Sequence, residues 1–206
     1  MPEAEALITL SAAIASRDRA RLRAALLRAK EEADPVAVDE ILLQSHLFVG
    51  FPIALNAFVL WLEIGGTVAE PMGEGDAVEW ASRGERVCAE VYGRNYRRLR
   101  DRVAALHPAL DRWMAETGYG RVIGRPRVDL RTRELCIVAL LAVWDTPDQL
   151  HSHLRGALNA GATAAEVERA LDLAAEHVDA DSALRNRELW NVILARPHPA
   201  GPHPAA

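Results

Sequence analysis

An acid and an imidazole in the second half of the chain could work together as an acid–base pair. Glu134 stands at the start of an apolar stretch, 135–144 (LCIVALLAVW), and His153 follows soon after it. A carboxylate that holds and orients an imidazole is a common arrangement for proton transfer near neutral pH. These two residues are therefore the first candidates for chemistry in this sequence.

Two consecutive helices would have to position these side chains. The stretch 135–144 is apolar on all sides, which predicts a helix buried over most of its circumference. Thr146 followed by Pro147 predicts the start of a second helix, because threonine is a preferred N-cap and proline suits the first helical position. A tight hairpin would offset Glu134 and His153 by only about 6 Å along the helix axes. With helices about 8 to 10 Å apart, the two side chains come near hydrogen-bond reach.

A second histidine competes for the same role. His151 and His153 flank one apolar helix face, so periodicity does not choose between them. Small residues around Gly156 lie on the His153 flank and permit close helix approach or leave a cavity, whereas His151 has Asp148 and Arg155 at helical spacing. We therefore expect His153 to be buried and His151 to be solvated.

The same residues also have a purely structural interpretation. A buried His153 can hydrogen-bond within a core, and Glu134 can pair with the neighbouring Arg131 or Arg133. For an isolated glutamate and histidine this interpretation takes precedence over a catalytic one. The choice depends on what surrounds the pair.

Composition and spacing predict an all-α protein. Ala, Leu, Arg and Glu dominate, and apolar residues recur at three and four positions, so every long segment is expected to be helical and strands almost absent. Capping signals place further helix starts after Asp34 and at Thr163, where Glu166 completes a capping box. Gly161 is expected to end the helix that precedes Thr163.

The chain matches itself at an offset of 128 residues, and at 129 after a one-residue insertion. The matched pairs are Leu7 with Leu135, Leu22 with Leu150, Leu26 with Leu154, Ala29 with Ala157, Val38 with Val167, Leu42 with Leu171, Ala54 with Ala183, Leu55 with Leu184 and Trp61 with Trp190. The matches predict two internally repeated helical units, although a chain rich in leucine and alanine also produces such matches by chance. In the first copy, Ala6 and Ala25 stand where the second has Glu134 and His153.

This comparison divides the chain into four parts. We expect a first helical repeat over 1–64 that serves as scaffold, a connector with helices over 65–124, a second helical repeat over 125–195 that carries the site, and a disordered tail over 196–206. The tail (RPHPAGPHPAA) holds too much proline to pack as a regular element.

Charge and cysteine content exclude several classes of function. The net charge is −5 over 206 residues, and the arginines of 94–102 are interleaved with acids and leucines, so the basic field that nucleic acid requires is missing. Cys88 and Cys136 have neither C-x-x-C nor metal-ligand spacing, so we expect no disulfide framework and no metal site. The acidic N-terminus, and apolar runs that we judge too short to cross a bilayer, predict a cytoplasmic chain that is neither secreted nor membrane-spanning.

Three longer strings resemble a known family. RPRVDLRTRELCIVALLAV (125–143) followed by QLHSHLRGALNAGATAAEVERAL (149–171) resembles the signature of carboxymuconolactone decarboxylases, and VDEILLQSHLFVGFPIALNA (38–57) resembles the helix that ends such domains. The resemblance implies an alkylhydroperoxidase D-like helical bundle that assembles as a homo-oligomer, a trimer or a multiple of it. It also implies an activity without a cofactor.

The resemblance also shows what is missing. In the related alkylhydroperoxidase D proteins the site resembles E…C-x-x-C-x-x-x-H, which places the acid on Glu134, the histidine on His153 and the cysteines on Thr146 and Gln149. Thiol peroxidase chemistry needs an attacking thiolate and a resolving thiol, so both absences argue against a dithiol peroxidase. Cys136 as a lone peroxidatic thiol is a weaker third interpretation, because burial in an apolar helix is expected to raise its pKa.

We therefore predict a cofactor-independent lyase that acts on a small lactone or carboxylate. In this hypothesis His153 donates the proton, Glu134 fixes its orientation and tautomer, and one of three arginines binds the substrate carboxylate. These arginines are Arg131, Arg133 and Arg155. The alternative is an alkylhydroperoxidase-like family member without the redox cysteines, in which the pair is structural and the helices serve assembly.

Overall fold

The computed structural model describes residues 2–70 and 75–195, and every regular element in these ranges is helical. In chain order the elements are α1 (Pro2–Ser16), α2 (Arg19–Glu32), α3 (Pro35–Glu63), α4 (Ala77–Tyr92), the 3-10 turn η1 (Gly93–Asn95), α5 (Tyr96–Leu106), α6 (Pro108–Trp113), the π-helix η2 (Met114–Ile123), α7 (Leu130–Trp144), α8 (Pro147–Asn159), α9 (Ala164–Ala175) and α10 (Ala180–Leu194). The predicted all-α class is confirmed. The tail 196–206, for which we predicted disorder, lies outside the described residues.

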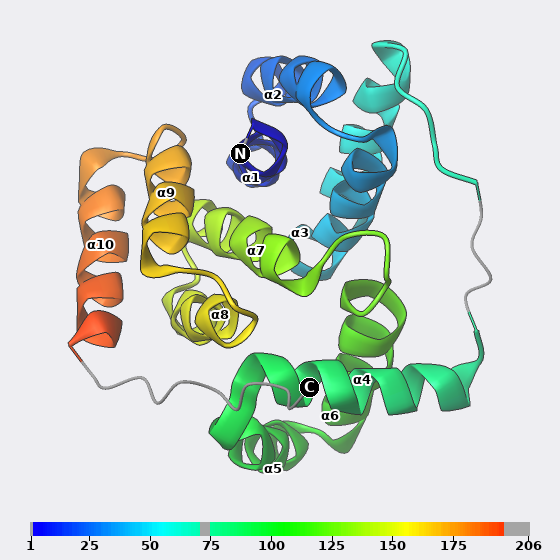
Figure 1. The fold of residues 1–206 in the computed structure, drawn as a ribbon, viewed down its shortest axis with the longest axis vertical. Helices are drawn as coiled ribbons and strands as arrows, with labels where there is room; N and C mark the ends of the chain where they lie inside the picture. Colours follow the sequence, from blue (N-terminus) through cyan, green and yellow to red (C-terminus); the bar gives the residue numbers. More distant parts are fainter. Residues whose placement is uncertain (1, 71–74, 196–206) are drawn as a thin grey trace.

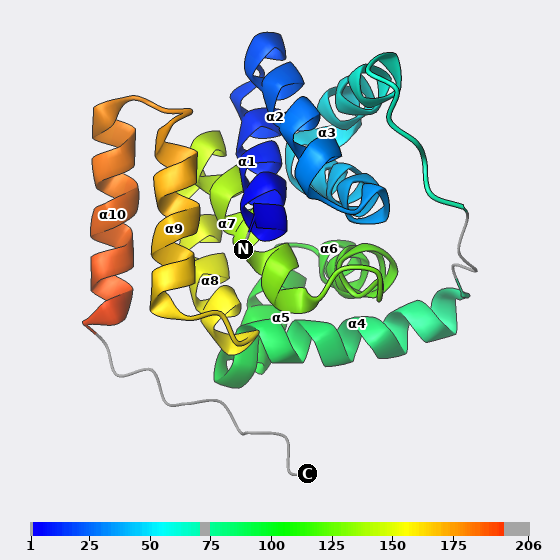
Figure 2. The same ribbon diagram turned by 45° about the horizontal axis from the view of Figure 1, so that its top comes forward.

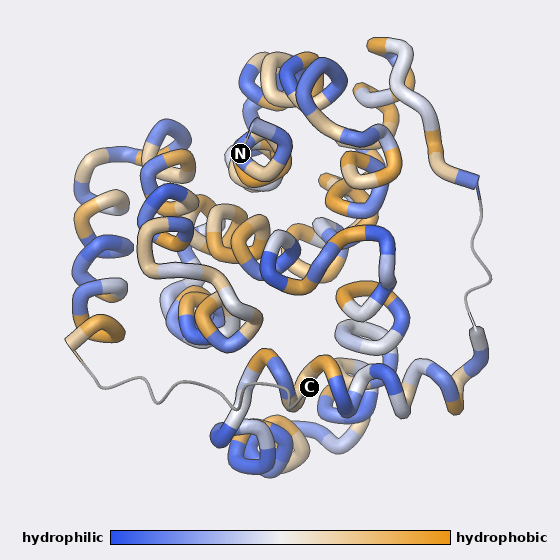
Figure 3. The backbone as a smooth tube through the Cα atoms, in the orientation of Figure 1, coloured by the Kyte–Doolittle hydropathy of each residue, from blue (hydrophilic) through white to orange (hydrophobic). Residues whose placement is uncertain are grey.

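The helix α7 forms the centre of the molecule. It packs against α1, α8 and α9, and Figure 1 shows it running through the middle of the bundle. Every residue from Thr132 to Ala142 is buried, and the tube in Figure 3 is rich in apolar positions along this helix. A helix that is apolar on all sides is stable only when its neighbours cover the whole circumference.

The segment 77–123 packs together at one end of the bundle, and its helices α4 and α5 lie below α7 and α8 in Figure 2. Within this segment, glycines allow α4 and η2 to approach closely. A Cβ on Gly84 would lie 2.0 Å from the backbone oxygen of Ala115, and a Cβ on Gly120 would lie 2.0 Å from that of Trp80. These distances leave no room for a side chain, so the two helices meet backbone against backbone.

The helix α3 is interrupted near its middle. Gly50 has a φ of 77°, a conformation that favours glycine, and Pro52 follows it inside the helix.

By length and composition alone, α3 is nevertheless long and apolar enough to cross a membrane. The expectation that no apolar run reaches such a length is therefore wrong, because the 29 residues of α3 continue through the interruption. A buried core helix passes the same test.

Helix capping follows the sequence at Asp34 and Thr163 but not at Thr146. A carboxylate oxygen of Asp34 accepts from the backbone N–H of Val36 at 2.8 Å, and Thr163 forms the predicted capping box with Glu166. The helix α8 begins at the predicted residue, yet the side chain of Thr146 makes no capping hydrogen bond. The proline at the first helical position is therefore the start signal that operates there.

Helix boundaries run in parallel on the two sides of the predicted duplication. Shifted by 128 residues, α1 covers 130–144, which are the bounds of α7, and the start of α2 at Arg19 falls on Pro147, the start of α8. The interruption of α3 at Gly50 lies where the second half of the chain has the turn between α9 and α10. The duplication and the four-part division remain predictions, which superposition of the two halves would test.

Candidate functional site

Glu134 and His153 meet in the interior of the protein. The Nδ1 of His153 on α8 lies 2.8 Å from the Oε2 of Glu134 on α7. Glu134 is 0% exposed and His153 is 5% exposed. The predicted approach of these two side chains is confirmed.

A glycine makes room for the carboxylate. A Cβ on Gly156 would lie 2.5 Å from the Oε2 of Glu134 and 2.8 Å from the Cγ1 of Val91. Gly156 is three residues beyond His153 on α8, so the two residues share one side of the helix. The missing side chain therefore leaves the space in which Glu134 reaches the imidazole.

The pair fixes the orientation of the imidazole. Among the described residues, the second carboxylate oxygen of Glu134, Oε1, is buried without a hydrogen-bond partner. A buried carboxylate is costly unless it is paired, so the contact with His153 is the one that stabilises Glu134. Because Nδ1 of His153 faces Glu134, Nε2 is the nitrogen that remains for a ligand.

His153 lines a pocket with a volume of about 570 Å³. The lining residues come from α3, α4, α6, η2 and α8, and they are Leu47, Phe48, Tyr92, Leu110, Trp113, Met114, Thr117, Gly118, Tyr119, Ile123, Gln149 and His153. The rings of Phe48 and Tyr92 meet the imidazole edge-on, with centroid distances of 5.7 Å and 6.3 Å. A mostly apolar pocket of this size with a few polar groups suits a small organic ligand.

Two of the three predicted substrate-binding arginines point away from this pocket. Arg131 pairs with Glu166 at 3.2 Å, and the fully buried Arg133 pairs with Glu40 at 2.8 Å. Successive helical residues are rotated by about 100°, so Arg133 cannot share the direction of Glu134, which follows it. The alternative expectation, that one of these arginines pairs with Glu134, is wrong as well.

The third arginine, Arg155, lines a different pocket of about 300 Å³ together with His151. A residue two positions after His153 on a helix lies about 200° further round the axis, on nearly the opposite face. The expectation of an arginine beside His153 is therefore corrected for all three candidates, because helix geometry directs their side chains elsewhere.

The buried arginine belongs to an ion cluster that sequence reasoning missed. Glu40 on α3 accepts from Nη2 of Arg133 at 2.8 Å and from Nε of Arg125 at 2.9 Å. Burial by itself raises the pKa of Glu40, but the hydrogen bonds from Arg125 and Arg133 outweigh burial and hold the pKa below its ordinary value of 4.5. The cluster ties α3 to the first turn of α7 and so helps to place Glu134.

Two tyrosines of the pocket wall were also missed. Tyr92 ends α4 and Tyr119 lies in η2, and the hydroxyl of Tyr119 donates to that of Tyr92 at 2.9 Å. Both lie in the segment that sequence reasoning treated only as a connector. The glycines Gly84 and Gly120 were the only hint in the sequence that α4 and η2 pack closely. No local sequence pattern, however, shows that Gly84 lies against η2 and Gly120 against α4.

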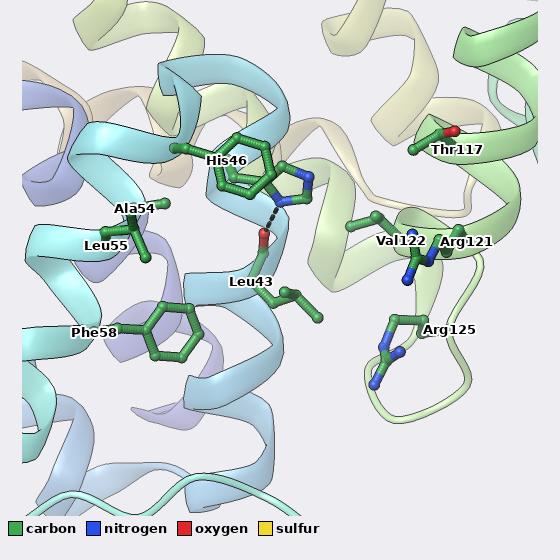
Figure 4. A pocket seen from close by; sticks show the side chains of 10 residues that line it. Leu43, His46, Ala54, Leu55, Phe58, Thr117, Arg121, Val122 and Arg125 are labelled. Atoms are coloured by element: carbon green, nitrogen blue, oxygen red, sulfur yellow. Dashed lines mark hydrogen bonds between the residues drawn. The ribbon is translucent and has the colours of Figure 1, made fainter. Parts of the chain in front are cut away.

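Figure 4 shows a second apolar pocket, of about 380 Å³, between α3 and η2. Its lining residues are Leu43, His46, Phe51, Ala54, Leu55, Phe58, Thr117, Arg121, Val122 and Arg125. The Nδ1 of His46 lies 2.5 Å from the backbone oxygen of Leu43, and its ring packs 5.0 Å from that of Phe51. The imidazole of His46 thus faces a backbone oxygen, whereas that of His153 faces a carboxylate. This second pocket therefore lacks the acid–base pair found at His153.

The other reactive side chains do not add to the site. Cys88 and Cys136 are both fully buried, and neither lines the His153 pocket. Burial raises the pKa of the Cys88 thiol to about 12 and also raises that of Cys136. Within 2–70 and 75–195, no group of three or more His, Cys, Asp or Glu residues could hold a metal ion.

We expect iodoacetamide to label both cysteines of the native protein very slowly at pH 8. A pKa of about 12 at Cys88 leaves about a thousandfold less thiolate than an ordinary cysteine has. Mass spectrometry of the alkylated protein measures the rates, with guanidinium-unfolded protein as the control. Rapid labelling of Cys136 in the native protein would contradict this result and revive the thiol peroxidase interpretation.

The fold and the site together define a class: an all-α protein in which a buried glutamate–histidine pair adjoins an apolar pocket. Residues 108–191 match the carboxymuconolactone decarboxylase family. This segment holds α7, α8 and both members of the pair, so this part of the chain is similar to that family. The resemblance seen over 125–143 and 149–171 is thus confirmed, whereas the string 38–57 lies outside the match.

The chain is also similar to Peroxisomal protein 2 of Schizosaccharomyces pombe (strain 972 / ATCC 24843). The two are 30% identical over an alignment of 145 residues, and the match covers 66% of this chain and 66% of the relative. The match therefore spans just under two thirds of the relative's own length.

Replacing Gly156 with alanine is expected to disturb the pair without removing either member. The new Cβ would stand 2.5 Å from Oε2 of Glu134, so the carboxylate must leave its present position. We expect the ¹H–¹⁵N NMR signal of the His153 Nδ1 group to move as its hydrogen bond weakens. Ser152→Ala on the same helix is the control, because the Ser152 hydroxyl bonds to the backbone oxygen of Asp148 and not to the pair. An unchanged Nδ1 signal in the Gly156 variant would contradict the assigned role of this glycine.

Proposed function

We propose that the protein is a cofactor-independent lyase in which His153 transfers a proton and Glu134 orients the imidazole. The observation that carries this proposal is the 2.8 Å contact of the buried Glu134 with His153, which itself lines an apolar pocket. The family match over 108–191 supports the proposal, because both residues lie within it. A filled core around His153 would have favoured the structural alternative, and the pocket favours catalysis.

The reaction that suits this arrangement begins at a carbon next to a carbonyl group. Nε2 of His153 removes a proton from that carbon, and the C–H electron pair moves toward the carbonyl oxygen to form an enolate. A group on the next carbon then leaves with its bonding electrons, a carbon–carbon double bond forms, and the imidazolium returns the proton to the leaving group. The electrons stay within the substrate and its products, so the step needs no redox partner. Small lactones that carry a leaving group on that next carbon belong to this class.

Hydrogen exchange at a simple ketone tests the proposal without the natural substrate. Methyl 2-naphthyl ketone has acidic methyl hydrogens next to its carbonyl, and ¹H NMR in D₂O follows their replacement by deuterium. We expect the wild-type protein to accelerate this exchange. Glu134→Gln keeps the size of the side chain and removes its charge, so we expect it to lower the rate by about tenfold or more.

The control for this experiment is Glu166→Gln, which changes an acid that pairs with Arg131 on α7 without touching His153. It is expected to leave the exchange rate unchanged. Exchange no faster than in buffer, or equal rates in wild type and Glu134→Gln, would sink the lyase proposal.

We also propose that the chain forms a homo-oligomer, a trimer or a multiple of it. The second half of α3 carries four large apolar side chains that are each more than half exposed, namely Phe51, Leu55, Val59 and Leu62. Their spacing of three and four residues places them along one face, where exposure to water is unfavourable. Light scattering is expected to give a mass near three times 22.6 kDa, or a multiple of that value. Leu55→Glu should lower the mass, and a wild-type mass of 22.6 kDa would contradict the proposal.

A further inference from the structure

The hydroxyl groups of Tyr92 and Tyr119 form a polar pair in the wall of the His153 pocket. Tyr119 donates to the oxygen of Tyr92 at 2.9 Å, and the two rings meet edge-on with centroids 5.8 Å apart. The ring of Tyr92 lies 6.3 Å from the imidazole of His153, again edge-on. All three side chains line the same pocket, so one small ligand could contact both the tyrosine pair and the histidine.

Backbone packing fixes the position of this pair. The two tyrosines come from α4 and η2, which meet at Gly84 and Gly120 with no space for side chains between them. A donor held in this way is already oriented before a ligand binds. Such preorganised donors are effective where negative charge develops during a reaction.

Burial keeps both hydroxyls protonated. It raises the pKa of Tyr92 and raises that of Tyr119 well above its ordinary value of 10, and the charge of Glu134 acts in the same direction. Because Tyr92 accepts the proton of Tyr119, its own proton is not used in that bond. The Tyr92 O–H is therefore the donor that a ligand oxygen would meet.

The charges around the pocket indicate what kind of ligand it takes. His153 is the one basic side chain among the described residues that line it, and Glu134 lies 2.8 Å from the imidazole, where it would offset any positive charge. A carboxylate ligand would lose its hydration on binding here and would find no unpaired cation in the pocket wall. This loss is unfavourable in an apolar site. An uncharged ligand meets no such penalty.

We propose that the pocket binds an uncharged, largely apolar carbonyl compound, with the Tyr92 hydroxyl donating to the carbonyl oxygen and His153 facing the neighbouring carbon. The role given to His153 rests on the proposed lyase function. As the proton leaves carbon and charge moves onto the carbonyl oxygen, the Tyr92 hydrogen bond strengthens and stabilises the enolate. Tyr119 is a positioning residue, because it acts through Tyr92.

Two probes with the same ring system test this assignment. Methyl 2-naphthyl ketone is uncharged, whereas 2-naphthoate carries a carboxylate in place of the acetyl group. Isothermal titration calorimetry at pH 8 is expected to show the ketone binding to the wild-type protein about tenfold or more tightly than the carboxylate. Tyr92→Phe is expected to weaken ketone binding by about five- to tenfold, the usual effect of losing one buried hydrogen bond.

The matched control is Tyr96→Phe, which removes a hydroxyl that is bonded to Arg100 on α5 and does not line the pocket. It should leave ketone binding unchanged. Tyr119→Phe is a second variant, expected to give a smaller loss than Tyr92→Phe, and circular dichroism checks that each variant is folded. Three results would each overturn the assignment. They are equal or tighter binding of 2-naphthoate, equal ketone affinity in Tyr92→Phe and Tyr96→Phe, and no ketone binding to the wild type.

Binding and exchange separate this inference from the proposed function. If the ketone binds selectively through Tyr92 but its methyl hydrogens do not exchange, the assignment of the pocket stands and the lyase proposal fails. If exchange continues at the wild-type rate in Tyr92→Phe but depends on Glu134, the lyase proposal stands and the role of Tyr92 is refuted.

Discussion

His153→Gln is expected to lower ketone hydrogen exchange by about 10² to 10⁴-fold, the usual contribution of a positioned general base. The glutamine side chain cannot accept and return a proton, so the reaction loses its base. Its amide can still donate to Glu134, which is fully buried, so we expect the melting temperature to change little. ¹H NMR in D₂O measures the exchange, and thermal circular dichroism measures the stability.

His151→Gln provides the matched control, because His151 lies two residues away on α8 and lines a different pocket. His151 is half-buried and not solvated as expected from the sequence, but its replacement is expected to keep the wild-type exchange rate. The opposite pattern, in which His153→Gln melts at a much lower temperature and keeps its activity, would identify His153 as a structural core residue. The catalytic interpretation would then have to be abandoned.

Glu40→Gln is expected to destabilise the folded protein by about 3 to 5 kcal/mol, because it leaves buried arginine charge without a carboxylate. Arg133 is 0% exposed and would retain only neutral oxygen partners such as Gln44. Guanidinium unfolding followed by circular dichroism measures the free energy of unfolding. Glu63→Gln, on the same helix but in an exposed pair with Arg19, should cost no more than about 1 kcal/mol. Equal losses of unfolding free energy in the two variants would show that the buried cluster contributes no more to stability than the exposed pair.

The stability difference between wild type and Glu40→Gln is expected to shrink in acid. The pKa of Glu40 is lower in the folded protein than its ordinary value of 4.5, so the unfolded chain takes up this proton first as the pH falls. The stabilisation is therefore complete above about pH 4.5 and is lost as the pH falls through the folded-state pKa. A difference that stays constant from neutral to acidic pH would contradict the assigned ionisation of Glu40.

Much of the fold and half of the site could be predicted from the sequence, because those features depend on neighbours along the chain. Apolar spacing predicted the helices, and the capping signals at Asp34 and Thr163 placed helix starts correctly. The contact between Glu134 and His153 also follows from local geometry, since a short turn between two helices leaves little freedom in their relative positions.

Only the tertiary structure decided what surrounds the pair. Arg133 stands next to Glu134 in the sequence, yet its charge is taken by Glu40 from another helix, and no local pattern encodes that partner. Tyr92 and Tyr119 reach the pocket because glycines far apart in the sequence let α4 and η2 meet. Such contacts depend on how whole helices pack. A sequence read without relatives therefore indicates which side chains can do chemistry, whereas the three-dimensional packing of distant segments determines which of them share a pocket.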